Sequence, residues 1–425
     1  MHAVHSLSGV AGVNGKRVLY GLTVPCGKVI PPVSPPDAMT PLERRTAFAL
    51  SAALFLRMTG LFMVLPVLAL YADELPGATP LLVGLALGLY GFSQAALQIP
   101  FGRWSDRAGR KPVIAIGLVI FSLGGLIAAF AGHIFTVILG RTLQGAGAVS
   151  GATLALAADL TRPEQRTKTM AIIGISIGFA FSLAFVLGPV IDAAFGLRGV
   201  FLSAAAAGVG AMLLVLFAVP TPPPPLAIVV TPAGETSHHL RALYFGVLFL
   251  HLVLASSFVS IPLVLVQDLA LPKAEHYTLY LPALLLSLVL IGPLLGRSHR
   301  KGIDARYFPL SIGCMVVAEL MLWLMPATFS GVLLALTLFF AGFNFLEAIL
   351  PSMISRAAPA SSKGVALGTY ATGQFAGTFL GGLTGGVAAS LFGTHGVFGA
   401  AGLLSILWLV LSQQGLLSLE APAES

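Results

Sequence analysis

The sequence predicts an all-α membrane protein with twelve transmembrane helices in two pseudo-symmetric halves of six. Its 425 residues are 57% hydrophobic and 9% charged, whereas a soluble domain carries about 25% charged residues. The apolar residues gather in runs of the roughly 20 residues needed to cross about 30 Å of hydrocarbon. Motif residues also recur at a near-constant shift between the halves. A soluble globule of this composition could not cover its own surface, so that class is excluded.

The apolar runs must be helical because only helices and closed barrels satisfy every backbone group inside lipid. Barrel strands would be about ten residues long with strict alternation, and these runs are longer and uniformly apolar. In chain order the predicted spans are 46–70, 80–101, 112–131, 134–157, 169–191, 199–218, 243–266, 276–296, 307–325, 328–350, 364–391 and 396–414.

Lys and Arg residues predict the orientation of these spans. With twelve spans, both termini and every even-to-odd loop share one side, and that side holds 19 of the 23 Lys and Arg residues. Only Arg198 and Lys273 fall on the other side, while Arg57 and Arg141 lie inside spans. Because cytoplasmic loops carry the excess of basic residues, we expect both termini in the cytoplasm of a bacterium, with the spans in its inner membrane.

The predicted domain boundaries follow from the spans. Residues 1–45 form a cytoplasmic tail, with Met39 as an alternative start of translation, and 46–218 form the first six-helix bundle. A proline-rich cytoplasmic linker covers 219–240, the second bundle covers 241–414, and a short cytoplasmic tail covers 415–425.

The two bundles carry a repeat. One near-constant shift in two loops indicates a duplicated six-helix unit, and duplicated halves are a transporter architecture. The repeated pairs are Gly102-Arg103 with Gly296-Arg297 at an offset of 194, Pro163 with Pro359 at 196, and Lys168 with Lys363 at 195.

The loop between spans two and three holds the most specific motif, Gly102-Arg-Trp-Ser-Asp-Arg-Ala-Gly-Arg-Lys111. We expect its glycines to allow close backbone approach. Asp106 is the single anion, and the free N–H groups where span eleven starts, at 361–364, would attract it. A plain basic loop would explain the Arg and Lys residues but not this Gly and Asp spacing. The predicted cytoplasmic latch comprises Gly102, Asp106, Arg107, Gly109, Arg110, Lys111 and a partner for Arg110, Asp159.

This loop resembles the signature of the major facilitator superfamily, G-x-x-x-D-R-x-G-R-K. Arg141-Thr-Leu-Gln-Gly-Ala-Gly147 resembles the family's R-x-x-Q-G-x-G. Gly178 and Leu187-Gly188-Pro189 resemble its antiporter motif, which departs at Asp192-Ala193. Stretches 57–66, 98–102 and 344–352 look like the YajR-type branch of the drug:proton antiporters. The resemblance covers about 45–415 and implies the major facilitator fold.

Polar residues inside the spans are the remaining functional signal, because a charge at mid-bilayer costs at least about 2.5–3.5 kcal/mol. The cavity and proton-coupling candidates fall in spans 1, 4, 7 and 10, which line the central cavity in the family that the chain resembles, and the substrate-cavity candidates form pairs on one face of span two and of span eleven. We therefore expect them to face one wettable cavity between the halves. The cavity and proton-coupling candidates are Arg57, Arg141, Gln144, His251, Asn344 and Glu347, and the substrate-cavity candidates are Gln94, Gln98, Tyr370 and Gln374.

Each candidate also has a structural interpretation. Arg57 could clamp neighbouring helices, His251 could bond one neighbour, and Glu347 could cap a helix near the membrane surface. For Glu319, in span nine, the structural role is favoured over a functional one. Which of His251 and Glu347 titrates is left open.

The predicted function is a secondary active transporter that exports a small amphipathic or hydrophobic compound in exchange for protons. No nucleotide-binding loop, metal cluster or catalytic triad appears in the sequence, so we expect no cofactor, no metal, no nucleic-acid partner and no enzyme activity. The proton gradient then supplies the energy, and we expect a functional monomer in the lipid bilayer. The alternatives are a proton-coupled transporter of a sugar or other polar metabolite and, more distantly, a non-transporting membrane sensor.

Overall fold

The computed structural model describes residues 12–13, 16–19, 22–25, 38–71, 74–221, 238–301, 304–359 and 363–420. Most of the predicted linker and of the predicted N-terminal tail, with Cys26, lies outside the described residues, as do residues 421–425. The chain divides into two units, Met1–Thr40 and Pro41–Ser425. The first unit contains a small antiparallel sheet in the order β1 (Gly12–Val13), β2 (Lys16–Leu19) and β3 (Leu22–Pro25). The sequence analysis did not predict these strands.

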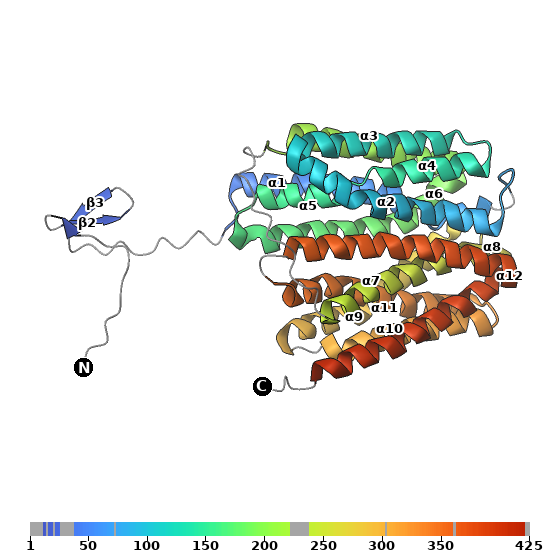
Figure 1. The fold of residues 1–425 in the computed structure, drawn as a ribbon. Helices are drawn as coiled ribbons and strands as arrows, with labels where there is room; N and C mark the ends of the chain where they lie inside the picture. The colour runs from blue at the N-terminus through green and yellow to red at the C-terminus, as the bar shows by residue number, and fades with distance from the viewer. Residues whose placement is uncertain are drawn as a thin grey trace. The chain divides into compact units, whose positions relative to one another are not determined.

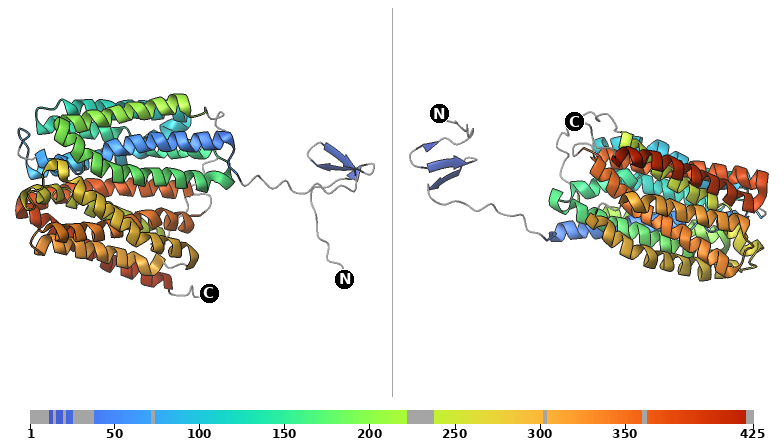
Figure 2. Two further views of the ribbon diagram at one scale, coloured as in Figure 1. Left: turned by 180° about the vertical axis from the view of Figure 1, so that it is seen from behind. Right: turned by 90° about the horizontal axis from the view of Figure 1, so that it is seen from below.

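The second unit is a helical bundle in which blue-to-green helices of the first half pack beside yellow-to-red helices of the second (Figures 1 and 2). Its elements are α1 (Pro41–Phe62), η1 (Leu68–Tyr71), α2 (Pro80–Ala108), α3 (Arg110–Ala129), α4 (Ile134–Ala146), α5 (Ser150–Asp159), α6 (Pro163–Leu213), η2 (Leu214–Ala218), α7 (His238–Ser257), α8 (Ile261–Gln267), η3 (Lys273–Glu275), α9 (Tyr277–Lys301), α10 (Asp304–Leu324), α11 (Phe329–Ala357) and α12 (Lys363–Glu420).

The described helices account for all twelve predicted spans. Eight stretches are long and apolar enough to cross a membrane, and two of these hold 56 and 49 residues, about twice the length of one span. Each of the two reverses at one glycine, Gly196 in α6 (φ +64°) and Gly393 in α12 (φ +74°), a conformation that residues with a Cβ rarely adopt. The first, fourth and seventh spans are each broken, into α1 with η1, α4 with α5 and α7 with α8. The predicted fold class is confirmed.

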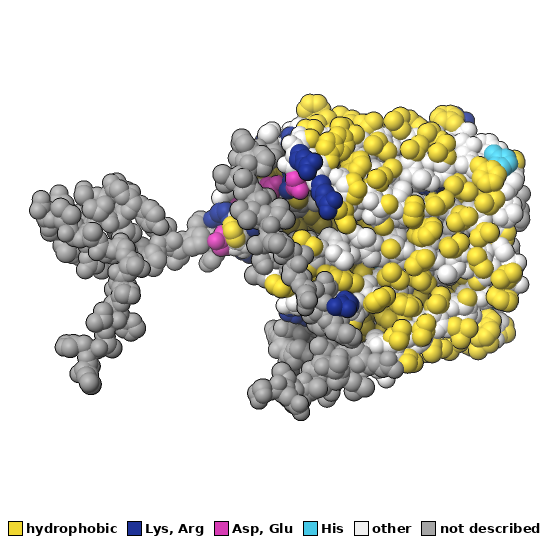
Figure 3. Space-filling view, in the orientation of Figure 1, with side chains coloured by type: hydrophobic (Ala, Val, Ile, Leu, Met, Phe, Trp, Pro, Cys, Tyr) yellow, Lys and Arg dark blue, Asp and Glu magenta, His cyan; other side chains and the backbone are white. Residues whose placement is uncertain are grey.

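The surface of this bundle is that of a membrane protein. Apolar side chains cover most of the face shown in Figure 3, while Lys and Arg gather at one end. We call this the basic end; it holds the start of α1 and the loops after α2 and α5. The opposite end holds the 74–79 and 268–276 loops. Large apolar side chains such as Ile175 (74% exposed) and Phe217 (76%) face outward, as lipid contact requires.

Glycines let the two halves pack closely between α2 and α12. A Cβ on Gly88 would lie 2.7 Å from the backbone oxygen of Phe379, and one on Gly382 would lie 2.7 Å from the backbone nitrogen of Gly88. Small residues permit this approach because nothing separates the two backbones. Since Gly88 lies near the start of α2, this contact belongs to the half of the bundle nearer the opposite end.

An aromatic cluster also closes the opposite end. Phe185 of α6 lies 4.9 Å from Phe258, 5.4 Å from Tyr280 and 5.8 Å from Phe340, measured between ring centroids. Phe181, one turn away, stacks on Phe343 at 5.7 Å. We call these six residues the aromatic cluster; two come from the first half and four from the second. An ion pair between Lys273 Nζ and Glu74 Oε1, 3.0 Å apart, joins the surface loops of the two halves.

Candidate functional site

Arg57 organises a buried polar network in the first half. Its side chain is 0% exposed and donates to Gln94 Oε1 at 2.8 Å, Ser150 Oγ at 3.0 Å and the Tyr90 hydroxyl at 3.1 Å. The break between α4 and α5 lets the backbone oxygen of Gly147 accept a fourth bond, at 3.4 Å. These four acceptors are neutral, so the cation is held by dipoles.

Arg141 extends the same network. Its guanidinium donates to Gln144 Oε1 at 3.0 Å and to the backbone oxygen of Ala86 at 3.3 Å, and it lies 4.8 Å from the ring centroid of Tyr90. One tyrosine therefore serves both cations, accepting from Arg57 with its hydroxyl and facing Arg141 with its ring. Gln94 in turn donates to Gln98 Oε1 at 3.1 Å.

The expectation that these residues line a wettable cavity fails for the first half in this structure. Arg57 and Arg141 are 0% and 1% exposed, and Gln94, Gln98 and Gln144 are at most 5% exposed. Neither arginine points at lipid. Tyr90 and the broken fourth span enclose them, so most of their polar groups bond inside the first bundle instead of to water, while Arg57 Nε is buried without a hydrogen-bond partner among the described residues.

The second half brings four predicted residues together around one carboxylate. Glu347 Oε1 accepts from Gln374 Nε2 at 2.7 Å and from the Tyr370 hydroxyl at 3.1 Å. His251 Nε2 lies 3.7 Å from Glu347 Oε2 and 3.3 Å from Gln374 Nε2. The Glu347 side chain is 34% exposed. We call these four residues the carboxyl cluster; unlike the arginine network, it is open to its surroundings.

The tautomer of His251 follows from its second nitrogen. Nδ1 lies 3.1 Å from the backbone oxygen of Val247, which can only accept, so Nδ1 carries the hydrogen. Nε2 then has a free lone pair that accepts from Gln374. A proton on Nε2 would turn it into a donor, which repels the Gln374 amide and attracts Glu347.

Asn344 does not join the carboxyl cluster. Its Nδ2 donates to Ser287 Oγ of α9 at 3.1 Å. The arginine network and the carboxyl cluster approach each other across the α2–α12 contact, where the rings of Tyr90 and Phe375 meet edge to face at 6.2 Å. Phe375 directly follows Gln374 in the chain, so the two polar networks flank one interface between the halves.

The motif predicted as a loop between spans two and three is the end of α2 and the start of α3, joined at Gly109, and it forms an ion-pair network within the first half. Arg110 lies 2.5 Å from Asp106 Oδ1 and 3.0 Å from Asp159 Oδ2, and it also donates to Ser105 Oγ at 2.8 Å. Lys111 donates to the backbone oxygens of Leu216 and Val219 at 3.0 and 2.8 Å. Asp106 and Arg107 are exposed. The expected partner of Asp106 at 361–364 lies outside the residues whose side chains the structure describes.

The two glycines of this motif, Gly102 and Gly109, differ in their backbone conformation. Gly109 adopts φ +93°, which a residue with a Cβ would strain to reach. The expectation of close backbone approach is wrong for both. A Cβ on Gly102 would meet nothing within 4 Å, and one on Gly109 would meet only the Pro112 ring, at 3.7 Å and beyond, because no other backbone approaches this loop here.

Sequence reasoning missed two buried carboxylates with structural partners. Glu43, 3% exposed, accepts from Arg162 Nε at 2.8 Å and Nη2 at 3.0 Å. Asp192 accepts from the Tyr71 hydroxyl at 2.5 Å, and that hydroxyl accepts from the Leu197 N–H at 2.9 Å. The departure from the antiporter motif at Asp192 thus fixes the turn around Gly196.

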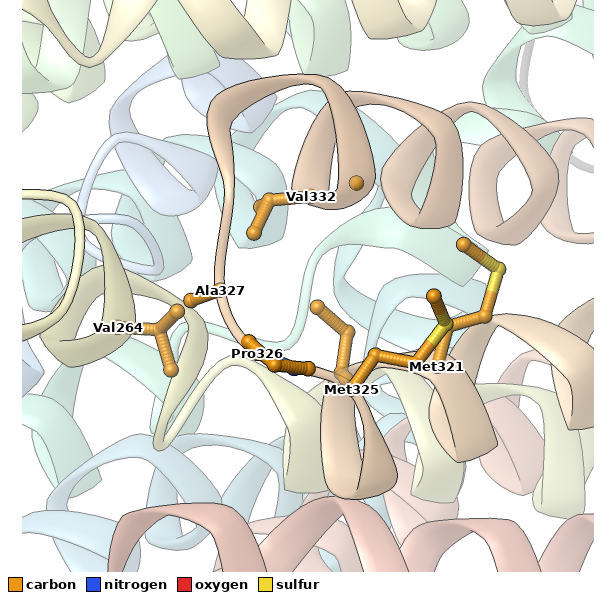
Figure 4. A pocket seen from close by; sticks show the side chains of 8 residues that line it. Val264, Met321, Met325, Pro326, Ala327 and Val332 are labelled. Atoms are coloured by element: carbon orange, nitrogen blue, oxygen red, sulfur yellow. The ribbon is translucent and has the colours of Figure 1, made fainter.

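A small apolar hollow lies at the opposite end, lined by residues that include Val264, Met321, Pro326 and Val332 (Figure 4). No titratable side chain lines it, and none of the candidate residues does. It has no group that could bind an ion or orient a polar ligand, so the two polar networks remain the candidate site.

Two helical halves, each with a polar network beside their shared interface, define a polytopic membrane transporter. The family comparison agrees, because the model of the Major Facilitator Superfamily matches residues 50–352. The chain belongs to this superfamily. Its matched relatives are transporters and not enzymes.

Individual proteins support the assignment. The chain is 41% identical over 381 residues to the inner membrane transport protein YajR of Escherichia coli K12, covering 88% of this chain and 84% of that one. It is 33% identical over 172 residues to multidrug resistance protein 2 of Bacillus subtilis, covering 39% and 41%. A crystal structure of a bacterial homolog of the human lysosomal transporter Spinster shares the fold, with a TM-score of 0.73 and 14% identity over 89% of this chain and 97% of that one. The resemblance drawn from the sequence motifs is confirmed.

Proposed function

We propose that this protein exports small amphipathic or hydrophobic compounds from the cytoplasm in exchange for protons, with both termini cytoplasmic and its spans in a bacterial inner membrane. The carboxyl cluster is the observation that carries the proposal. It holds a carboxylate, an imidazole and two neutral hydrogen-bonding side chains from three helices of the second half. A proton gradient acting there supplies about 2.3 kcal/mol per charge for each 100 mV.

The proton step uses the contacts around Glu347. With the carboxylate ionised, Gln374 and Tyr370 both donate to Oε1. Oε2 is buried without a hydrogen-bond partner, so a proton can add there without breaking either bond. Alternatively, protonated His251 closes on Oε2 and releases the Gln374 amide. Either event changes the charge and the hydrogen bonding of α12, the helix that packs against α2.

Substrate binding draws on both sides of the interface. The arginine network supplies a positive field that is fixed, because Arg57 and Arg141 have no acidic partner among the contacts described for them. Gln94, Gln98, Gln374 and the Tyr90–Phe375 ring pair supply amide and apolar contacts. Alternating access then opens the halves around this region, which requires separation of α2 from α12.

The loop after α2 is proposed to stabilise the state in which the basic end is closed. Here Asp106 pairs with Arg110 inside its own loop. When the basic end closes, the start of α12 would approach, and Asp106 would bond its free N–H groups. Asp106→Asn should impair transport while leaving expression intact, and wild-type transport by this variant would remove the latch role.

Proteoliposomes test the proposal with ethidium, an amphipathic dye, and an imposed pH gradient. The wild-type protein should move ethidium only with the gradient and should move protons in the opposite direction. Glu347→Gln should lose the gradient-driven flux but keep ethidium exchange at equilibrium, whereas Glu275→Gln, which removes an exposed carboxylate, should behave as wild type. Dye flux without proton movement would refute antiport. Uptake of labelled maltose, with no ethidium flux, would favour the polar-metabolite alternative.

A further inference from the structure

A second carboxyl group lies within the spans of the second half, away from the carboxyl cluster. Glu319 of α10 is 0% exposed. Its Oε1 lies 2.5 Å from Ser257 Oγ, at the last residue of α7, and its Oε2 is buried without a hydrogen-bond partner. Within the part of the chain that the structure describes, Ser257 supplies the single hydrogen bond of this side chain. A carboxyl this poorly solvated is disfavoured as an anion.

The hydrogen count at Ser257 indicates which form is present. Its Oγ lies 2.8 Å from the backbone oxygen of Val253 as well as 2.5 Å from Glu319. A hydroxyl has one hydrogen to donate, and a carbonyl cannot donate. If the Ser257 hydroxyl donates its one hydrogen to the backbone oxygen of Val253, its contact with Glu319 is a hydrogen bond only when the Glu319 carboxyl donates. The geometry therefore fits a protonated carboxylic acid.

No charged partner neutralises Glu319 from the helices packed around it. On these helices the titratable side chains within the predicted spans are Tyr244 and His251 of α7, Glu347 of α11 and Tyr370 of α12, and His395 lies between the two spans of α12. His251 and Glu347 contact each other. His395 bonds the backbone oxygen of Leu322 at 3.0 Å and pairs with Asp268. Because none of them bonds Glu319 among the described contacts, a deprotonated Glu319 would be an isolated buried charge.

The duplication shows that the fold does not need this acid. In the second half, Gly402 packs against Glu319. A Cβ added to Gly402 would lie 3.5 Å from the Cβ of Glu319. In the first half, Gly208 packs in the corresponding place against Ser122. The offsets are 194 for the glycines and 197 for their partners, close to the shift of the whole repeat. Since a serine at this place allows the same helix packing in the first half, packing alone does not explain the glutamate in the second half.

We propose that Glu319 is a proton-binding site that keeps the opposite end closed. In its neutral form it holds the end of α7 through Ser257, and the next residue, Phe258, is part of the aromatic cluster. Loss of the proton leaves an anion that must gain water or a cation. That requires the α7–α8 break at 258–260 to move, and it withdraws Phe258 from Phe185 and Phe340. This role is separate from exchange at Glu347 and does not depend on it.

Infrared spectroscopy of the full chain in lipid nanodiscs tests protonation directly, without substrate. At neutral pH the wild-type protein should show the carbonyl absorption of a protonated carboxylic acid in an apolar site. Glu319→Gln should lose that absorption, and Glu275→Gln should keep it. An unchanged spectrum in folded Glu319→Gln protein would overturn the proposal.

Spin labels at positions 74 and 273 test the conformational role, because these residues pair across the opposite end. In protein whose two cysteines are replaced by serine, the closed population should fall as pH rises, by up to about tenfold per pH unit for one released proton. Glu319→Gln, which mimics the neutral acid, should stay closed over the same range. Equal pH dependence in both proteins would overturn the proposal. Sodium dependence of the wild-type distance at constant pH would also overturn it, since it would indicate a metal cation site.

Discussion

Replacement of Gly88 by alanine should force the opposite end open. The added Cβ would lie 2.7 Å from the backbone oxygen of Phe379 and 3.3 Å from its Cα. Both atoms belong to the backbone of α12, in the other half, so no side-chain rotation relieves the contact. Overpacking of this kind costs about 1–3 kcal/mol. Because the cost applies only while α2 and α12 are in contact, it shifts the equilibrium between states.

The size of that shift follows from the energy. A difference of about 1–3 kcal/mol changes a population ratio by about 5-fold to 150-fold. The helix propensity gained from Gly to Ala, about 0.5–1 kcal/mol, acts in both states and cancels. Gly313→Ala in α10 is the matched control, because its added Cβ would meet nothing within 4 Å.

The assay is the distance between spin labels at positions 74 and 273, measured in nanodiscs. Gly88→Ala should move most molecules to the longer distance, whereas Gly313→Ala should match wild type. Loss of the Glu74–Lys273 ion pair on labelling affects all samples equally, and an exposed pair contributes about 0–1 kcal/mol. A wild-type distance distribution in Gly88→Ala would show that the α2–α12 contact does not control closure.

Three further predictions concern buried contacts. Phe185→Ala removes the ring that meets three rings of the second half; it should cost about 3–5 kcal/mol and populate the longer label distance. Gln94→Leu removes the 2.8 Å acceptor of Arg57; purified protein should lose about 1.5–3 kcal/mol of stability to thermal unfolding, and unchanged stability would mean that water replaces the amide. Tyr71→Phe leaves the Leu197 N–H and Asp192 without their hydroxyl partner; it should cost about 1–3 kcal/mol in the same assay, and a neutral result would show that the turn needs no side-chain bond.

The sequence predicted the spans because hydropathy and length depend on local composition. It could not predict which polar residues meet. The hydrogen bonds of the carboxyl cluster join residues more than 20 positions apart in the chain: Glu347 with Tyr370, Glu347 with Gln374, and Gln374 with His251. The cluster therefore depends on how the helices pack. Burial was also misjudged for the arginines, since the break between α4 and α5 gives Arg57 a backbone partner at Gly147 and a hydroxyl partner at Ser150 that no periodicity indicates. The small sheet had a local signal, Asn14-Gly15 between Val13 and Lys16, a dipeptide typical of hairpins.

The two halves share one scaffold but differ in the sign of their buried charge. Among the predicted spans, those of the first half contain Arg57 and Arg141 and no acid, whereas those of the second contain Glu319 and Glu347 and no Lys or Arg. A protein that needed only satisfied packing would pair opposite charges within each half, because an isolated buried ion is costly. Because the cations lie in one half and the carboxyl groups in the other, the electrostatic energy between the halves depends on how closely they approach. Protonation of Glu347 removes part of that attraction, so it alters the balance between open and closed arrangements without any change in the helices themselves.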